Sequence, residues 1–106
     1  MSTGAPAVAV RDNPDEHRYE VTLDGSLAGF TLYRRRPGLI AFIHTEVDER
    51  FEGRGVGSAL ASFALDDARA RGLAVLPFCP FVASYIQRHT EYATLVPEQY
   101  RATFGI

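Results

Sequence analysis

Alternating apolar and polar residues mark the first clear element of the chain. Residues 18–24 follow the period-2 pattern of a half-buried strand. Asp24-Gly25 then predicts a tight hairpin turn, followed by a second strand over residues 27–34. Pro37-Gly38 predicts another turn, and a third strand runs over about residues 39–47. The pattern therefore predicts three antiparallel strands at the start of the domain.

The second half of the chain changes to a helical period. Polar positions recur every three to four residues over about 55–70, in an otherwise apolar segment, and Gly72 predicts the end of this helix. The apolar run 73–78 is typical of a strand covered on both faces in a parallel arrangement. A second helix begins at Pro80 and extends to about residue 89. The expected fold is a mixed α/β sheet, with three antiparallel strands followed by a βαβ unit and a C-terminal helix.

The two ends of the chain are less regular. Residues 1–16 mix Ala, Pro, Gly, Asp and Asn and show no secretory-signal pattern, so they are predicted to be a flexible tail before a single domain of residues 17–106. Apolar residues in 91–106 indicate packing without defining an element. A chain of 106 residues suits one small core, and no apolar run is long enough to span a bilayer. We therefore expect a cytoplasmic protein with no membrane partner.

Charge and cysteine content limit the partners, disulfides and metal sites that the chain can have. The formal net charge is -2, so no global positive field favours nucleic acid as a partner. Arg34-Arg35-Arg36 is a local basic cluster, for which a solvated hairpin end is the favoured interpretation. Cys79 is the only cysteine, which excludes an internal disulfide and a multi-cysteine zinc site. No metal site is expected.

Glycines 53, 55 and 57 stand between a predicted strand and a predicted helix. Backbone N–H groups and the helix dipole can bind a phosphate in such a place, and glycine lets a ligand approach the backbone closely. The spacing is too short for a dinucleotide fingerprint, and the Lys-Ser/Thr pair of a P-loop is missing. A turn that only starts the helix is the alternative to a phosphate cradle.

With these glycines in place, the order of elements resembles the GNAT superfamily of N-acetyltransferases. The resemblance lies in the segment Glu52-Gly53-Arg54-Gly55-Val56-Gly57-Ser58-Ala59-Leu60, between an antiparallel start and a strand-helix finish. Residues 43–47, 79–82 and 89–92 are also similar to a group of very short acetyltransferase-like proteins with a Cys-Pro-Phe motif. The match covers residues 19–96. Glu52 and Thr90 depart from the usual pattern, which has Arg or Gln and Pro at these positions.

The resemblance implies acetyl-CoA as co-substrate. Backbone groups of the glycine-rich turn would hold its pyrophosphate, and the pantetheine arm would insert like an extra strand where the third and fourth strands splay, after Val47 and Val75. Arg54 could add a positive charge, and Glu52 would be tolerated. The residues expected to bind the cofactor are Val47, Arg54, Gly55, Val56, Gly57 and Ser58.

Two candidate catalytic residues follow the fourth strand. Cys79 precedes Pro80 at the start of the second helix, where the helix dipole favours a thiolate. Cys79 could therefore be a nucleophile or lie near the acetyl group, or it could be a small buried hydrophobe. The resemblance places Tyr85 where a general acid would protonate the departing CoA thiolate. Packing alone is the alternative for Tyr85.

His44 and Glu46 are two residues apart on the third strand, so they share a face and could both line the slot. Either could relay a proton from an acceptor ammonium. An edge-strand charge for Glu46 and a hydrogen-bonded core histidine for His44 are the alternatives.

Together these features predict an acyltransferase that moves an acetyl group from acetyl-CoA to an unidentified amine. The alternative is an acetyl-CoA or CoA-binding module without efficient turnover. Compared with full-length superfamily members, the acceptor pocket is expected to be shortened, open, or completed by a second subunit in a homodimer.

Overall fold

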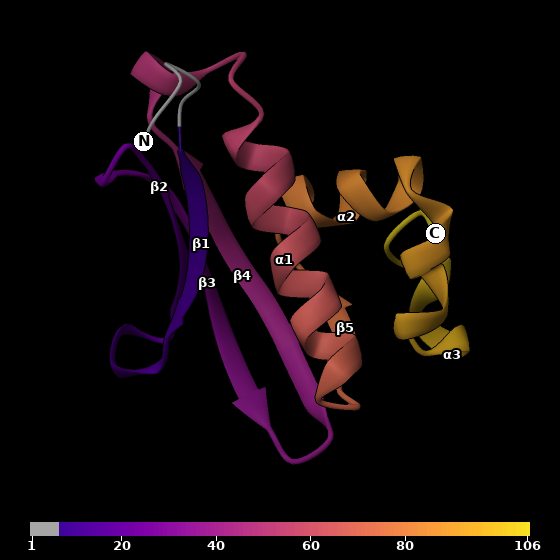
Figure 1. The fold of residues 1–106 in the computed structure, drawn as a ribbon. Helices are drawn as coiled ribbons and strands as arrows, with labels where there is room; N and C mark the ends of the chain where they lie inside the picture. The colour runs from indigo at the N-terminus through magenta and orange to yellow at the C-terminus, as the bar shows by residue number, and fades with distance from the viewer. Residues whose placement is uncertain (1–6) are drawn as a thin grey trace.

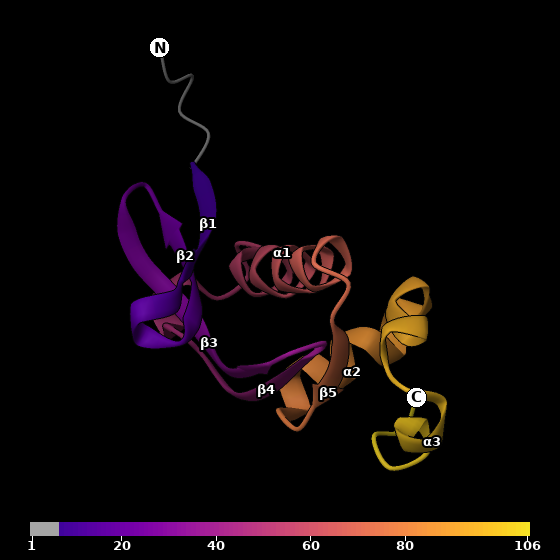
Figure 2. The same ribbon diagram turned by 90° about the horizontal axis from the view of Figure 1, so that it is seen from below.

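The computed structural model describes residues 7–106, which form a five-stranded mixed sheet with the long helix α1 across one face (Figures 1 and 2). The strands follow chain order, β1-β2-β3-β4-β5; the first four are antiparallel, and β5 is parallel to β4. The predicted α/β class is confirmed. The strands are β1 Val8–Asn13, β2 Arg18–Leu23, β3 Ser26–Arg36, β4 Leu39–Val47 and β5 Ala74–Pro77, and the α-helices are α1 Val56–Ala70, α2 Pro80–Arg88 and α3 Glu98–Arg101.

The prediction of a flexible tail over residues 1–16 is wrong for residues 8–16; its first six residues lie outside the described chain. Strand β1 pairs with the whole of β2, and Pro14–Glu16 form one turn of 3-10 helix. The buried carboxylate of Glu20 on β2 accepts hydrogen bonds from Arg11 and Asn13. These contacts hold an edge strand that buries few apolar side chains, so the sheet has four antiparallel strands before β5.

Helix α1 covers the face of the sheet that carries Tyr19 and Phe42, both of which are fully buried. Its C-terminal half is fixed by a polar contact, because the Tyr19 hydroxyl donates to Asp67 Oδ2 at 2.5 Å. Arg71 Nε donates to the same oxygen at 2.8 Å. This packing directs the N-terminus of α1 toward the end of β4.

Strands β4 and β5 diverge early. Their pairing ends at Phe42↔Pro77, whereas β4 continues to Val47. The expected divergence after Val47 and Val75 is therefore wrong in position. Pro77 has no N–H to continue the ladder, and the chain turns so that Cys79 N donates to Phe42 O at 2.9 Å. Within residues 7–106, the last part of β4 is left without a strand neighbour on its β5 side.

After α2 the chain packs beside it in a 3-10 helix, Thr90–Leu95, and the short α3. Tyr92 and Val96 are buried, which confirms that the end of the chain packs. In the part of the chain that the structure describes, none of the helices has both the length and the apolar character needed to cross a bilayer.

Candidate functional site

The glycine-rich turn forms the entrance to α1. Gly53 and Gly55 have φ of 77° and 75°, a left-handed conformation that glycine adopts without steric cost. Ala59 N donates to Gly55 O at 3.0 Å, which is the first helical hydrogen bond. The N–H groups of Val56, Gly57 and Ser58 precede that bond and have no intrahelical acceptor. Three donors therefore gather at the positive end of the helix dipole.

Gly57 is required for close packing around this turn. A Cβ atom at Gly57 would lie 2.9 Å from Cζ of Phe81 on α2 and 3.7 Å from Cγ2 of Val47 on β4. The absence of a side chain therefore lets α2 and the end of β4 approach the first turn of α1. Three elements far apart in sequence meet at one glycine.

These elements enclose a surface pocket of about 340 Å³, called here the cradle pocket. Five of the six residues expected to bind the cofactor line it, namely Val47, Gly55, Val56, Gly57 and Ser58. Arg54 is the exception, and its N–H is already used, since it donates to Phe51 O at 3.3 Å. The remaining lining residues are Phe51, Glu52, Gly53, Phe81 and Arg88.

Arg88 is a site residue that sequence reasoning missed. It follows Phe81 by seven residues, so both lie on one face of α2. Its Nε donates to Ser84 O at 3.3 Å, and the side chain is otherwise exposed at the cradle pocket. The helical spacing from Phe81 was the available signal, but it has meaning only once α2 is known to pack on α1. The lining of the pocket thus includes one cation, Arg88, and one carboxylate, Glu52.

Next to the cradle pocket lies the β5-side edge of β4 beyond Phe42, which has no strand neighbour in the described chain and is called here the slot. Asp48 N donates to Ala28 O at 2.8 Å, so the main chain of Asp48 points toward β3. Because successive residues alternate in direction, the N–H and C=O groups of Thr45 and Val47 point to the opposite side, where β5 has already ended. In the described chain, β4 therefore has an unpaired strand edge beside the cradle pocket.

Cys79 is hydrogen-bonded to β4 where its pairing with β5 ends, through Phe42 O, and is buried, with 2% of its surface exposed. Its Sγ is 3.0 Å from Thr45 Oγ1, and Thr45 in turn donates to Thr31 Oγ1 at 2.9 Å. The thiol is therefore one end of a chain of hydrogen bonds through Thr45 to Thr31, between α2 and the sheet. Burial favours the small-hydrophobe interpretation over a nucleophile.

Tyr85 belongs to an aromatic cluster at the far end of α2. Its ring stacks on His89 with centroids 3.9 Å apart and lies 6.0 Å from the ring of Tyr92. The Tyr92 hydroxyl donates to Asp66 at 2.8 Å, and burial together with this hydrogen bond raises the pKa of Tyr92 to about 12. Tyr85 does not line the cradle pocket, and its ring lies against those of His89 and Tyr92.

His44 and Glu46 share a face of β4, as predicted, and their Nε2 and Oε2 atoms are 3.1 Å apart. A bulge at Ile43 shifts the alternation, because Leu32 pairs with His44 and Tyr33 with Phe42. Thr45 therefore points inward, while His44 and Glu46 point to the sheet face opposite α1, with 55% and 62% of their side chains exposed. They flank the slot on its outer side.

Comparison with solved structures identifies the fold of this site. The chain is similar to a ribosomal-protein-alanine N-acetyltransferase from Brucella melitensis biovar Abortus 2308, with a TM-score of 0.54 and 19% identity. The similarity covers 88% of this chain and 92% of that one, so the two share an N-acetyltransferase fold. No curated protein sequence matches the chain.

The family of the chain is assigned by a match of its sequence to a family model. The family model for GCN5-related N-acetyl-transferase matches residues 18–95, from the first residue of β2 into the segment after α2. The chain therefore belongs to the GCN5-related N-acetyltransferase family, whose chemistry is acyl transfer. The cradle pocket and the unpaired edge of β4 lie within the matched region.

Proposed function

We propose that this protein transfers an acetyl group from acetyl-CoA to an amine. One observation carries the proposal: the cradle pocket at the start of α1 opens directly onto the unpaired edge of β4. A phosphate site and a free strand edge in contact match a ligand that has a pyrophosphate at one end and an amide-containing arm at the other.

The pyrophosphate would lie at the N-terminus of α1. The free N–H groups of Val56, Gly57 and Ser58 can donate to its oxygens, and the helix dipole favours its charge. Arg88 supplies a full positive charge from α2. Glu52 opposes binding electrostatically, although its exposure to water weakens that effect.

The pantetheine arm would bind along β4 as an added strand. Its two amide groups can pair with the free main-chain groups of Thr45 and Val47. Phe81, which lines the cradle pocket, would contact the arm at one end, and Cys79, which lies against Phe42 and Thr45, would limit it at the other. Holding the thioester at a fixed place beside the acceptor supplies much of the rate acceleration.

The acceptor would approach from the sheet face opposite α1, where His44 and Glu46 lie. Its ammonium must lose a proton to one of them before the nitrogen attacks the thioester carbonyl. The C–N bond then forms, the C–S bond breaks, and the departing CoA thiolate takes the second proton, which the acylated nitrogen releases. We assign direct transfer to the amine, because a thiol as buried as that of Cys79 is poorly placed to carry the acetyl group.

Two measurements test this proposal. Saturating CoA should raise the melting temperature of the protein, and Arg88→Ala should reduce that rise, because it removes the cation from the cradle pocket. Arg54→Ala is the matched control, since Arg54 is on the same turn but outside the pocket lining. An absence of stabilisation by CoA would overturn the proposed ligand.

The second measurement is acetyl-CoA-dependent release of free thiol with a panel of amines. We expect release above the background rate with at least one amine, and an acetylated product by mass spectrometry. Stabilisation by CoA without thiol release from any acceptor would instead identify a CoA-binding module. A stable acetyl adduct on the wild type that disappears in Cys79→Ala would contradict direct transfer.

A further inference from the structure

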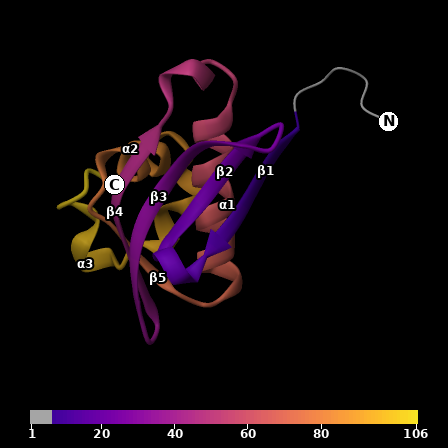
Figure 3. The same ribbon diagram turned by 90° about the vertical axis from the view of Figure 1, so that its left-hand side faces the viewer.

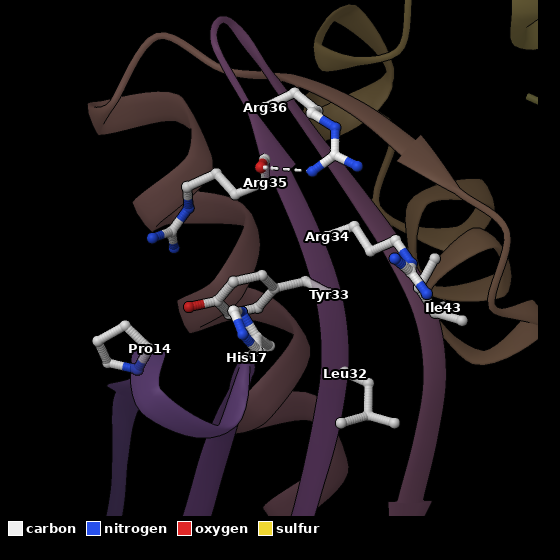
Figure 4. A pocket seen from close by; sticks show the side chains of 8 residues that line it. All are labelled: Pro14, His17, Leu32, Tyr33, Arg34, Arg35, Arg36 and Ile43. Carbon is white, nitrogen blue, oxygen red and sulfur yellow. Dashed lines mark hydrogen bonds between the residues drawn. The ribbon is translucent and has the colours of Figure 1, made fainter.

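The face of β2 and β3 opposite α1 carries no helix in the described part of the chain (Figure 3). At the C-terminal end of β3 this uncovered face is hollowed by a pocket of about 530 Å³, called here the basic pocket (Figure 4). Leu32 and Ile43 give it apolar surface, and Arg34 and Arg36 give it positive charge. Its volume is in the range of small-molecule sites.

Two arginines of the basic pocket are free to bind a ligand. Arg34 and Arg36 are exposed, and among residues 7–106 neither forms an ion pair. Arg36 Nη1 reaches only the main-chain oxygen of Arg35, at 3.5 Å. Arg35 itself turns inward and binds Asp12 and the hydroxyl of Tyr19. The described lining of the pocket includes no Asp or Glu, so its charge favours an anion.

The main chain of β3 adds a hydrogen-bond donor to the basic pocket. Tyr33 N donates to His17 O at 2.9 Å, on the β2 side of β3. Because alternate residues of a strand point the same way, the N–H of Arg35 also points to that side, where the pairing with β2 has already ended at Arg18↔Leu32. Two guanidinium groups and a main-chain N–H are the donors that the oxygens of a carboxylate or phosphate require.

The basic pocket lies beside the end of the slot where the thioester is proposed. Ile43 lines this pocket and directly follows Phe42, where the pairing of β4 with β5 ends and where Cys79 would limit the arm. Figure 4 shows the side chain of Arg34 beside Ile43. The cradle pocket, in contrast, meets β4 at Val47, at the pyrophosphate end of the proposed ligand.

The strand register gives the separation between the proton acceptor and the cations. His44 is opposite Leu32, and Arg34 is two residues further along β3. With strands about 4.8 Å apart and a rise of about 3.3 Å per residue, the main-chain positions of His44 and Arg34 are about 8 Å apart. An amine at His44 and an anion at Arg34 can therefore belong to one small molecule.

We infer that the acetyl acceptor is a small amine that also carries a carboxylate or phosphate, separated from the reacting nitrogen by a short apolar linker. This inference rests on the proposed function. Arg34 and Arg36 bind the anion, Leu32 and Ile43 contact the linker, and the ammonium lies at His44, beside the thioester. An α-amino acid without a further anionic group is too short to span this distance.

Binding of small amines tests the inference without depending on turnover. δ-Aminovalerate, pentylamine and cadaverine have the same chain length and differ in a terminal carboxylate, methyl or ammonium group. Each is titrated by NMR against the full chain saturated with CoA. δ-Aminovalerate should bind about threefold to tenfold more tightly than pentylamine, as expected for a carboxylate paired with exposed arginines, and cadaverine should bind most weakly. The difference should shrink as salt is added.

Two further probes define the anion and its distance from the amine. Glycine should bind more weakly than δ-aminovalerate, because its carboxylate cannot reach Arg34 while its amine is at His44. Aminobutylphosphonate should also bind more tightly than pentylamine, and the tighter of the two anionic ligands identifies the acceptor's anion as a phosphate or a carboxylate. Glycine binding as tightly as δ-aminovalerate overturns the proposed span.

Charge reversal in the basic pocket supplies the decisive variant. Arg34→Glu/Arg36→Glu should reverse the order, so that cadaverine binds best. The control Arg69→Glu/Arg101→Glu changes the net charge equally in a different pocket, beside α3, and should keep the original order, with circular dichroism verifying both folds. Equal binding of the three amines, or an order that Arg34→Glu/Arg36→Glu leaves unchanged, overturns the inference.

The positions of the shifted amides give an independent result. δ-Aminovalerate should shift the amide signals of residues 34–36 and of His44 together. Shifts at residues 34–36 alone overturn the inference, because the amine then lies away from the thioester. A dimer in sedimentation that Arg34→Glu/Arg36→Glu dissociates also overturns it, because a second copy would then cover the basic pocket.

The same samples separate this inference from the proposed function. Stabilisation by CoA with no discrimination among the amines overturns only the acceptor class. An absence of stabilisation by CoA overturns the acetyl-CoA site itself, whatever the amines do.

Discussion

Replacing Gly55 by alanine tests the cradle pocket most directly. Gly55 has a φ of 75°, and a Cβ added there would meet no protein atom within 4 Å. The folding cost is therefore backbone strain alone, about 1 kcal/mol for an alanine in the left-handed region. For a domain of this size, we expect the melting temperature to fall by about 4–8 °C.

The chain contains a matched control for that strain. Gly38, in the hairpin between β3 and β4, has a φ of 73°, and a Cβ added there would have equally open space around it. Gly38→Ala should lose the same stability as Gly55→Ala. Only Gly55 lines the cradle pocket, so only Gly55→Ala should affect CoA.

The expected effect on CoA can be stated in the same units. At a CoA concentration of about 100 Kd, the ligand stabilises the wild type by about 2.7 kcal/mol. If a methyl group and the disturbed N–H groups of the turn weaken binding about tenfold, the same concentration gives only about 1.4 kcal/mol. Thermal unfolding of the wild type and both variants, with and without CoA, measures these values.

Two outcomes of comparing Gly55→Ala with Gly38→Ala would contradict the role of Gly55. If Gly55→Ala and Gly38→Ala retain the full stabilisation by CoA, the turn before α1 does not bind the ligand. If both lose it equally, the effect comes from reduced stability and not from the pocket.

Three further changes test separate features of the site and the fold. Glu52→Gln should tighten CoA binding about twofold to fivefold by calorimetry, since it removes a carboxylate from the cradle pocket; unchanged affinity at low salt would contradict that placement. Cys79→Ala should retain acetyl transfer at a similar kcat, and loss of transfer in a folded variant would restore the nucleophile hypothesis. Burial alone would raise the pKa of Asp67, but hydrogen bonds from Tyr19 and Arg71 outweigh it and lower that pKa. The ionised carboxylate therefore stabilises the fold above about pH 4, and this contribution to the free energy of unfolding is lost as the pH falls further. Asp67→Asn should therefore lower the free energy of unfolding by about 1–2 kcal/mol at neutral pH. Urea unfolding measured over a range of pH should also show a weaker loss of stability below about pH 4 than in the wild type; an equal loss would exclude this contact as the cause of the acid sensitivity.

Local signals predicted much of the sheet and α1. The hairpin at Asp24-Gly25 is confirmed, and both residues have positive φ, at 50° and 82°, as a two-residue turn of the preferred hand requires. The alternation in β2 is visible because its apolar residues face α1. Gly55 was recognisable for a similar reason, since a glycine before a helix is a local feature.

Features that depend on distant partners could not be predicted in this way. Strand β1 has no clear alternation, and Val8 is 41% exposed; Glu20 on the neighbouring strand supplies the side-chain contacts that hold it. The role of Arg88 depends on the packing of Phe81 against Gly57. The outward direction of His44 depends on a bulge, which a strict period-2 pattern does not contain.

The slot itself follows from a short strand, and its signal was present in the sequence. Two prolines stand three residues apart, at Pro77 and Pro80, and neither can donate a backbone hydrogen bond. Pro77 ends the pairing with Phe42, and Pro80 begins α2 after a single hydrogen bond from Cys79 to that same strand. Strand β5 therefore cannot cover the rest of β4, and the exposed edge is a direct consequence of proline chemistry. The cradle pocket and the strand edge beside it are therefore both formed by the segments from β4 to α2.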